Sequence, residues 1–201
     1  MNTASHSSPT IASQLWPQGQ SATALRYVVL AVAGSLLMAL ASKVQIPTVP
    51  VPITMGTFVI LGLSMAYGWR LAAATVALYL LEGAFGLPVF AGTPEKGIGI
   101  AYMMGGTGGY LLGYLLAALS CGWLAEQGWD RSVLKTAAAM VIGNVVIYLP
   151  GLLWLGILFG WDKPILEWGL TPFILGDLTK IALASAVLPL VWKWINTRQK
   201  G

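Results

Sequence analysis

Two oppositely charged residues lie inside a long apolar stretch near the end of the chain. In the run Gly176-Asp177-Leu178-Thr179-Lys180, a carboxylate and an ammonium group are three positions apart. If this stretch is a helix, both groups share one face and can reach each other or a common ligand. An ionisable side chain in an apolar segment usually faces a cavity and marks a site. The pattern favours a site for a small polar molecule, and a self-neutralising pair that only supports packing is the alternative.

Three further polar residues in apolar segments are candidates for the same site. Glu82 is placed either to face a cavity or to extend towards the membrane surface. Asn144 and Tyr148, four positions apart, share a helical face. They are suited equally to hydrogen bonding into a cavity and to joining neighbouring helices.

The composition indicates that these residues are held by a membrane protein. Of the 201 residues, 57% are hydrophobic and 9% are charged, and the mean hydropathy is +0.75. The bases behind the net charge of +4 are scattered between apolar segments and form no stripe suited to nucleic acid. The single histidine, His6, lies in a polar N-terminal stretch, which argues against a Ser-His catalytic pair or a histidine metal site.

Six apolar segments are long enough to be read as membrane helices. They cover about residues 25–41, 54–67, 69–85, 107–125, 133–159 and 171–195. An even number places both termini on one side. Lys and Arg are concentrated on that side (Arg26, Arg70, Arg131, Lys135, Lys193, Arg198 and Lys200), with only Lys43, Lys96 and Lys163 opposite. The fold class we expect is an all-α integral membrane protein with six transmembrane helices and cytoplasmic termini. Residues 1–23 should be a mobile polar tail, 24–196 a single membrane domain, and 197–201 a short basic tail.

Two connections and one glycine-rich segment complete the pattern. Residues 45–54 contain three prolines at alternating positions, which favours an extended course, and with residues 87–92 this segment is expected to form a lid over a cavity. Residues 105–110 read Gly-Gly-Thr-Gly-Gly-Tyr and match neither phosphate-binding fingerprint. No ATP site is predicted, and most of these glycines are expected to allow close helix packing.

Together, these motifs resemble the BioY family, the biotin-specific substrate-binding subunits of energy-coupling-factor (ECF) vitamin transporters. The resemblance rests on residues 47–54 (Pro-Thr-Val-Pro-Val-Pro-Ile-Thr), 86–92, 105–111 and 176–180, and it covers about residues 25–195. It implies a membrane subunit that captures biotin from outside a bacterial or archaeal cell. The implied partners are a transmembrane coupling subunit and ATPase subunits that hydrolyse ATP for it.

The resemblance also implies roles for the candidate residues. Asp177 and Lys180 match the family's ligand-binding pair in the last helix. Asp177 would accept the ureido N–H groups of biotin and Lys180 would donate to its carbonyl, while Lys96 would meet the carboxylate at the cavity mouth. The reversed pose, with Lys180 on the carboxylate, stays open. Asn144, Tyr148 and Tyr110 would complete the polar or stacking contacts.

Two other functions compete with this one. A self-sufficient, proton-coupled secondary transporter of a small anionic or polar metabolite would use Asp177 as its proton carrier, but the two halves of the chain show no convincing similarity. A membrane enzyme is disfavoured because the apolar segments contain no histidine and no recognisable nucleophile motif. We therefore expect no enzymatic activity, no cofactor and no metal, with biotin as a transported ligand only.

Overall fold

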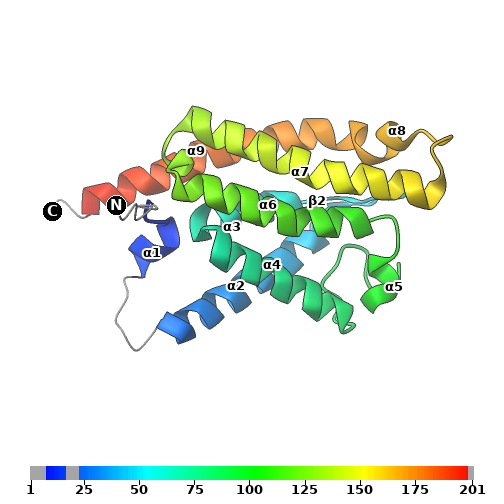
Figure 1. Ribbon diagram of the computed structural model, residues 1–201, viewed down its shortest axis with the longest axis horizontal. Helices are drawn as coiled ribbons and strands as arrows, with labels where there is room; N and C mark the ends of the chain where they lie inside the picture. The colour runs from blue at the N-terminus through cyan, green and yellow to red at the C-terminus, as the bar shows by residue number, and fades with distance from the viewer. Residues whose placement is uncertain (1–7, 17–22, 199–201) are drawn as a thin grey trace, which may run out of the picture.

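The computed structural model describes residues 8–16 and 23–198. The chain is almost entirely helical, with one two-stranded ladder (Figure 1). Its elements are α1 (Ile11–Leu15), α2 (Thr23–Lys43), β1 (Gln45–Ile46), β2 (Ile53–Thr54), α3 (Gly56–Tyr67), α4 (Trp69–Ala84), α5 (Gly99–Met103), α6 (Gly108–Glu126), η1 (Trp129–Arg131), α7 (Val133–Phe159), α8 (Ile165–Gly169), η2 (Thr171–Phe173) and α9 (Ile174–Arg198).

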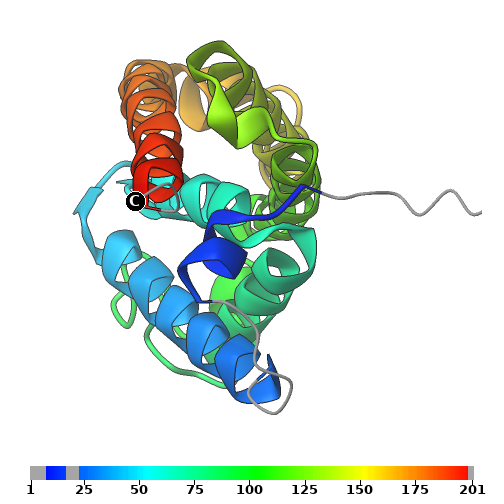
Figure 2. The same cartoon turned by 90° about the vertical axis from the view of Figure 1, so that its left-hand side faces the viewer.

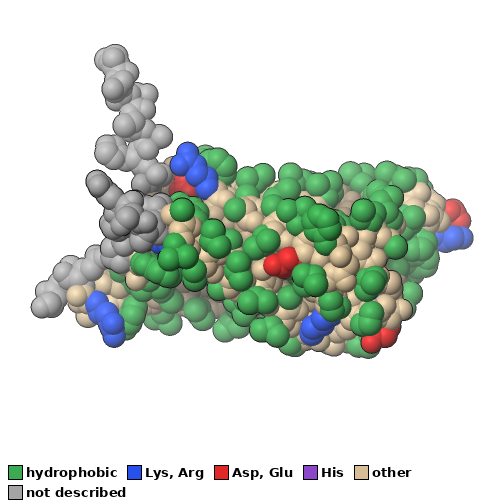
Figure 3. Space-filling view, turned by 90° about the horizontal axis from the view of Figure 1, so that it is seen from below, with side chains coloured by type: hydrophobic (Ala, Val, Ile, Leu, Met, Phe, Trp, Pro, Cys, Tyr) green, Lys and Arg blue, Asp and Glu red, His purple; other side chains and the backbone are tan. Residues whose placement is uncertain are grey.

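A helix occupies each of the six segments expected from hydropathy. In the described part of the chain, four stretches are long and apolar enough to cross a membrane: Ala24–Lys43, Gly108–Glu126, Val133–Phe159 and Ile165–Arg198. The helix α3 is shorter but also apolar. One face of the surface is covered largely by hydrophobic side chains with few charges (Figure 3), as expected for helices that contact lipid.

Helix α6 is the central element of the bundle, and glycines allow its closest contacts. It packs against α3, α4 and α7. A Cβ added at Gly113 would lie 2.7 Å from the Cα of Ile147, and one at Gly109 would lie 2.2 Å from the carbonyl oxygen of Pro150. Because these neighbours are backbone atoms of α7, only glycine permits this approach. The expected role in close helix packing is thereby confirmed for Gly109, and Gly113 plays the same role one turn further along α6.

The long connections gather at one end of the molecule, which we call the loop end. The labels β2, α5 and α8 lie there, opposite α1 and the last turns of α9 (Figure 1). The expected extended course of residues 45–54 is confirmed, since Gln45 pairs with Thr54 and Ile46 with Ile53 in an antiparallel ladder.

The N-terminal tail differs from the expectation of a mobile segment where it is described. Helix α1 packs against α3 and α9 and lies between the two sides of the bundle at the end opposite the loops (Figure 2). Ile11 and Ala12 are buried, and the Nη2 of Arg26 donates to the carbonyl of Ala12 at 2.9 Å. Two apolar side chains and a buried guanidinium therefore hold a segment that composition alone marks as a tail. His6 lies outside the described residues.

Candidate functional site

The charged pair of the last helix is enclosed by the bundle. Helix α9 begins at Ile174, directly after the short helix η2, so Asp177 lies in its first turn and Lys180 follows on the same face. The side chains of Asp177 and Lys180 are 7% and 10% exposed, and their Oδ1 and Nζ atoms are 3.2 Å apart. Asp177 also lies close to the positive end of the helix dipole. The sequence prediction of a buried pair is confirmed.

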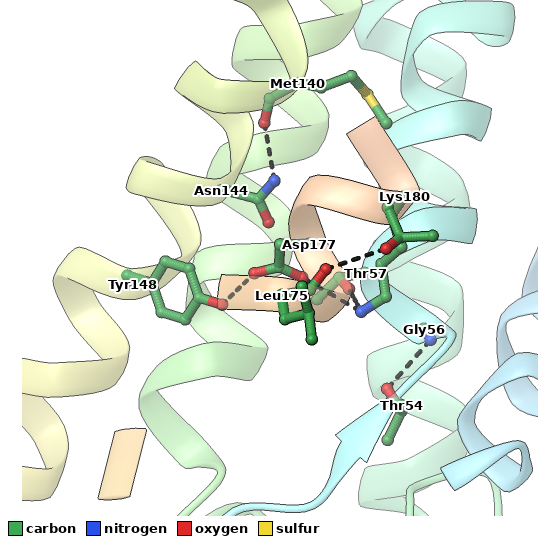
Figure 4. Close-up of polar contacts among 10 residues, drawn as sticks. Thr54, Gly56, Thr57, Met140, Asn144, Tyr148, Leu175, Asp177 and Lys180 are labelled. Carbon is green, nitrogen blue, oxygen red and sulfur yellow. Dashed lines mark hydrogen bonds and ion pairs between the residues drawn. The ribbon is translucent and has the colours of Figure 1, made fainter. Parts of the chain in front are cut away.

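Two other helices complete the hydrogen bonding of this pair (Figure 4). The hydroxyl of Tyr148 on α7 donates to Oδ2 of Asp177. The ammonium of Lys180 donates to Oγ1 of Thr57 on α3 at 2.8 Å. Each charge therefore has a partner besides the other, and the pair joins α3, α7 and α9.

A cavity with an empty volume of about 650 Å³, part of it open to solvent, lies beside this pair. Ligand pockets for small molecules combine apolar walls with a few placed polar groups. Lys180 and Tyr148 line the cavity, and so do aromatic side chains from every side: Tyr79, Phe90, Tyr102, Tyr110, Tyr114 and Phe173. The arrangement suits a ligand with an apolar body and one group that both donates and accepts hydrogen bonds.

Both segments expected to form a lid contribute to the cavity wall. Val51 and Pro52 come from the proline-rich connection, and Phe90 and Ala91 come from the connection between α4 and α5. All four are buried or nearly so. These two connections therefore cover the cavity at the loop end of the bundle.

Two predicted residues, Tyr110 in the cavity wall and Asn144 outside it, have already used part of their hydrogen-bonding capacity. The hydroxyl of Tyr110 donates to the carbonyl of Gly169 at 2.8 Å, so its ring, not its hydroxyl, faces the cavity. Asn144 lies near Asp177 (Figure 4), and its amide donates to the carbonyl of Met140 on its own helix at 3.0 Å. The carbonyl oxygen of Asn144 is the group that could serve a ligand.

The structure does not place Glu82 or Lys96 in the wall of this cavity, and their role in binding stays a prediction. The carboxylate of Glu82 accepts a hydrogen bond from Ser35 on α2 at 2.9 Å, so it joins two helices. The ammonium of Lys96 lies 3.4 Å from the carbonyl of Thr48 and joins the two loop-end connections. Neither lines the cavity. In both cases the polar group bonds to a residue from another element instead of facing the cavity. The local sequence does not reveal such a partner.

Sequence reasoning missed Thr57 and most of the aromatic wall. A threonine in an apolar helix and a phenylalanine among apolar residues carry no local signal of a site. Within the described part of the chain, no group of three or more His, Cys, Asp or Glu side chains is arranged to hold a metal ion.

Comparisons with known proteins point in one direction. The model of the BioY family matches residues 12–197. The chain is 33% identical over 163 residues to the biotin transporter BioY of Thermotoga maritima, covering 81% of this chain and 94% of that one. It is 31% identical over 168 residues to a probable biotin transporter BioY of Rickettsia prowazekii, covering 82% of each. A crystal structure of the S-component for biotin from an ECF-type ABC transporter superposes with a TM-score of 0.70 at 20% identity, covering 88% of this chain and 95% of that one.

Proposed function

The chain belongs to the BioY family, and on that basis we propose that it is the biotin-binding subunit of an ECF-type uptake transporter. The observation that carries this proposal within the structure is the buried Asp177–Lys180 pair, of which Lys180 lines a cavity with aromatic walls. A protein without a ligand for that cavity would gain little from such a pair, because removing two charges from water offsets most of their mutual attraction.

The chemistry of biotin fits the two ends of this site. Its ureido ring has two N–H donors and one carbonyl acceptor, and the rest of the molecule is apolar except for a terminal carboxylate. Asp177 accepts the N–H groups, and Lys180 donates to the ureido carbonyl. The reversed pose would bring the ligand carboxylate beside Asp177, whose own carboxylate lies only 3.2 Å from the Lys180 ammonium. Repulsion between the two carboxylates disfavours that pose. The aromatic rings then surround the apolar remainder.

We further propose how the chain lies in the membrane and what it works with. The helices in the six apolar segments, the shorter α3 and α4 included, cross the cytoplasmic membrane of a bacterium or archaeon. The termini lie inside, because seven of the eleven Lys and Arg residues fall on the terminal side. The loop end then faces outside, where biotin arrives. A coupling membrane subunit and ATPase subunits supply the energy, and the chain itself catalyses no reaction.

Binding of labelled biotin to the purified protein tests the proposal. Saturable binding to the wild type, lost in both Asp177→Asn and Lys180→Ala, is the expected result. The matched control is Asp162→Asn, which removes a carboxylate from an exposed ion pair with Lys163 in the α7–α8 connection. Unchanged affinity in the first two variants would remove the pair from the site. Uptake into vesicles by the chain alone, driven by a proton gradient and independent of ATP, would replace this function with secondary transport.

A further inference from the structure

The connection between α4 and α5 inserts one aromatic side chain into the bundle. Phe90 is 1% exposed and forms part of the cavity wall. Its ring stacks on Tyr102, with centroids 5.0 Å apart, and meets the edge of Tyr79 at 5.3 Å. A Cβ added at Gly83 would lie 2.0 Å from the Phe90 ring, so the ring rests directly on the backbone of α4. Tyr79, Gly83 and Tyr102 thus form a socket for Phe90.

The last turn of α2 holds the segment that carries this ring. The ammonium of Lys43 donates to the carbonyl of Phe90 at 2.8 Å, and to the carbonyl and Oγ1 of Thr93 at 3.1 and 2.8 Å. The hydroxyl of the preceding Ser42 donates to the carbonyl of Val89 at 2.6 Å. Hydrogen bonds from a charged donor are stronger than neutral ones. Two adjacent side chains of one helix therefore hold the backbone of residues 89–93, which we call the lid segment.

We propose that Lys43 is a positioning residue that holds Phe90 in its socket and thereby sets how fast a bound ligand escapes. The inference rests on the proposed function, because it concerns the wall of the same cavity. Its physical basis is the exposure of the Lys43 side chain, in contrast to the buried Phe90. Water can replace the bonds of an exposed ammonium at little cost, so the lid segment is able to open. The three bonds together still favour the closed position, each by a modest amount.

Removing the ammonium of Lys43 should favour the open position of the lid segment without removing any group from the polar end of the cavity. In Lys43→Met, we expect labelled biotin to dissociate about tenfold faster, which corresponds to about 1.4 kcal/mol. The number of binding sites per protein should be unchanged. Lys43→Arg, which keeps a cation with several N–H donors, should stay closer to the wild type. Lys163→Met, the same change at an exposed lysine with an acidic partner, is the control and should dissociate at the wild-type rate.

A second perturbation reaches the same ring from its other side. In Gly83→Ala the added methyl group would overlap the Phe90 ring, and we expect a similar increase in the dissociation rate. Gly62→Ala is the matched control, because a Cβ at Gly62 meets no atom within 4 Å.

A measurement without ligand separates this inference from the proposed function. Ala91, 7% exposed in the lid segment, is replaced by cysteine in a background where the buried Cys121 is alanine. A water-soluble thiol reagent should label Ala91→Cys about tenfold faster when Lys43 is also replaced by Met. Equal labelling rates would overturn the role of Lys43 whether or not biotin binds. Absence of biotin binding to the wild type, together with faster labelling, would overturn the proposed function and leave the role of Lys43 standing.

Discussion

Replacing Lys180 with methionine should destabilise the protein much more than replacing both members of its ion pair. Asp177 is only 7% exposed, and without Lys180 its charge is left in the bundle with the Tyr148 hydroxyl as its remaining side-chain partner. Removing one partner of a buried pair costs about 3–5 kcal/mol. Because the tyrosine bond is kept, we expect a loss near the lower value, about 3 kcal/mol.

The double variant Asp177→Asn/Lys180→Met removes both charges and keeps an acceptor for Tyr148. Its free energy of unfolding should lie within about 1 kcal/mol of the wild type, because buried pairs contribute little net stability. Biotin binding should nevertheless be lost. Recovery of stability without recovery of binding is the result that identifies the pair as a functional feature.

The exposed pair Asp162–Lys163 is the control for this reasoning. Its charged atoms are 2.9 Å apart, closer than those of the buried pair, but the Lys and Asp side chains are 49% and 72% exposed. The corresponding double-variant cycle should give a coupling of about 0–1 kcal/mol. All variants are compared by equilibrium unfolding in detergent micelles. The reasoning is refuted if Lys180→Met is as stable as the wild type, or if the double variant is as unstable as Lys180→Met.

Three further predictions concern other parts of the molecule. Burial raises the pKa of Asp130 from 3.8 to about 6, so the Asp130 carboxyl binds a proton more tightly in the folded protein than in the unfolded chain. The melting temperature of the wild type should therefore fall as the pH rises from about 4 to about 6, and that of Asp130→Asn should fall less. An equal fall in both proteins would contradict this. Tyr148→Phe removes only the hydroxyl that donates to Asp177, and should lower stability by about 1 kcal/mol and biotin affinity several-fold in a binding titration. Gly113→Ala places a methyl group 2.7 Å from the Cα of Ile147 and should lower the free energy of unfolding by about 1–3 kcal/mol. An unchanged free energy of unfolding would mean that α6 and α7 can move apart at no cost.

The long helices were predictable because apolar runs and the residues that end them are both local. Helix α3 ends at Tyr67 and α7 at Phe159, and each is followed by a glycine with positive φ, at Gly68 and Gly160. The short elements were not predictable in this way. The last apolar segment was expected to start near residue 171, but η2 occupies residues 171–173 and α9 begins at Ile174. Packing against the bundle, not hydropathy, decides where such short turns form.

The charged pair was predictable, and so was part of the neutral wall. Asp177 and Lys180 stand out because charges are rare in an apolar segment. Tyr110, Tyr148 and the loop that carries Phe90 were also expected near the cavity. Thr57 was not, because threonine is common in apolar helices. The partner of Glu82 was equally hidden, since the serine that donates to its carboxylate comes from another helix. Spacing along one helix predicts partners on that helix, whereas partners between helices depend on the packing.

Two lysines, Lys180 in the cavity wall and Lys43 bonded to the lid segment, illustrate how burial gives different roles to the same kind of side chain. Lys180 is buried and bonded to Asp177 and Thr57 inside the bundle. It gives up one of these hydrogen bonds only when a ligand supplies another in its place. Lys43 is exposed and bonded to backbone carbonyls of the lid segment, so water can take over its bonds at any time. The first arrangement favours selection of a ligand by its polar groups, and the second favours control of access. Because Phe90 and Lys180 line one cavity, a ligand held by the buried pair also supports the wall that Lys43 keeps in place. Slow escape of the ligand then requires both lysines, because Lys180 binds the ligand and Lys43 holds the wall of the cavity.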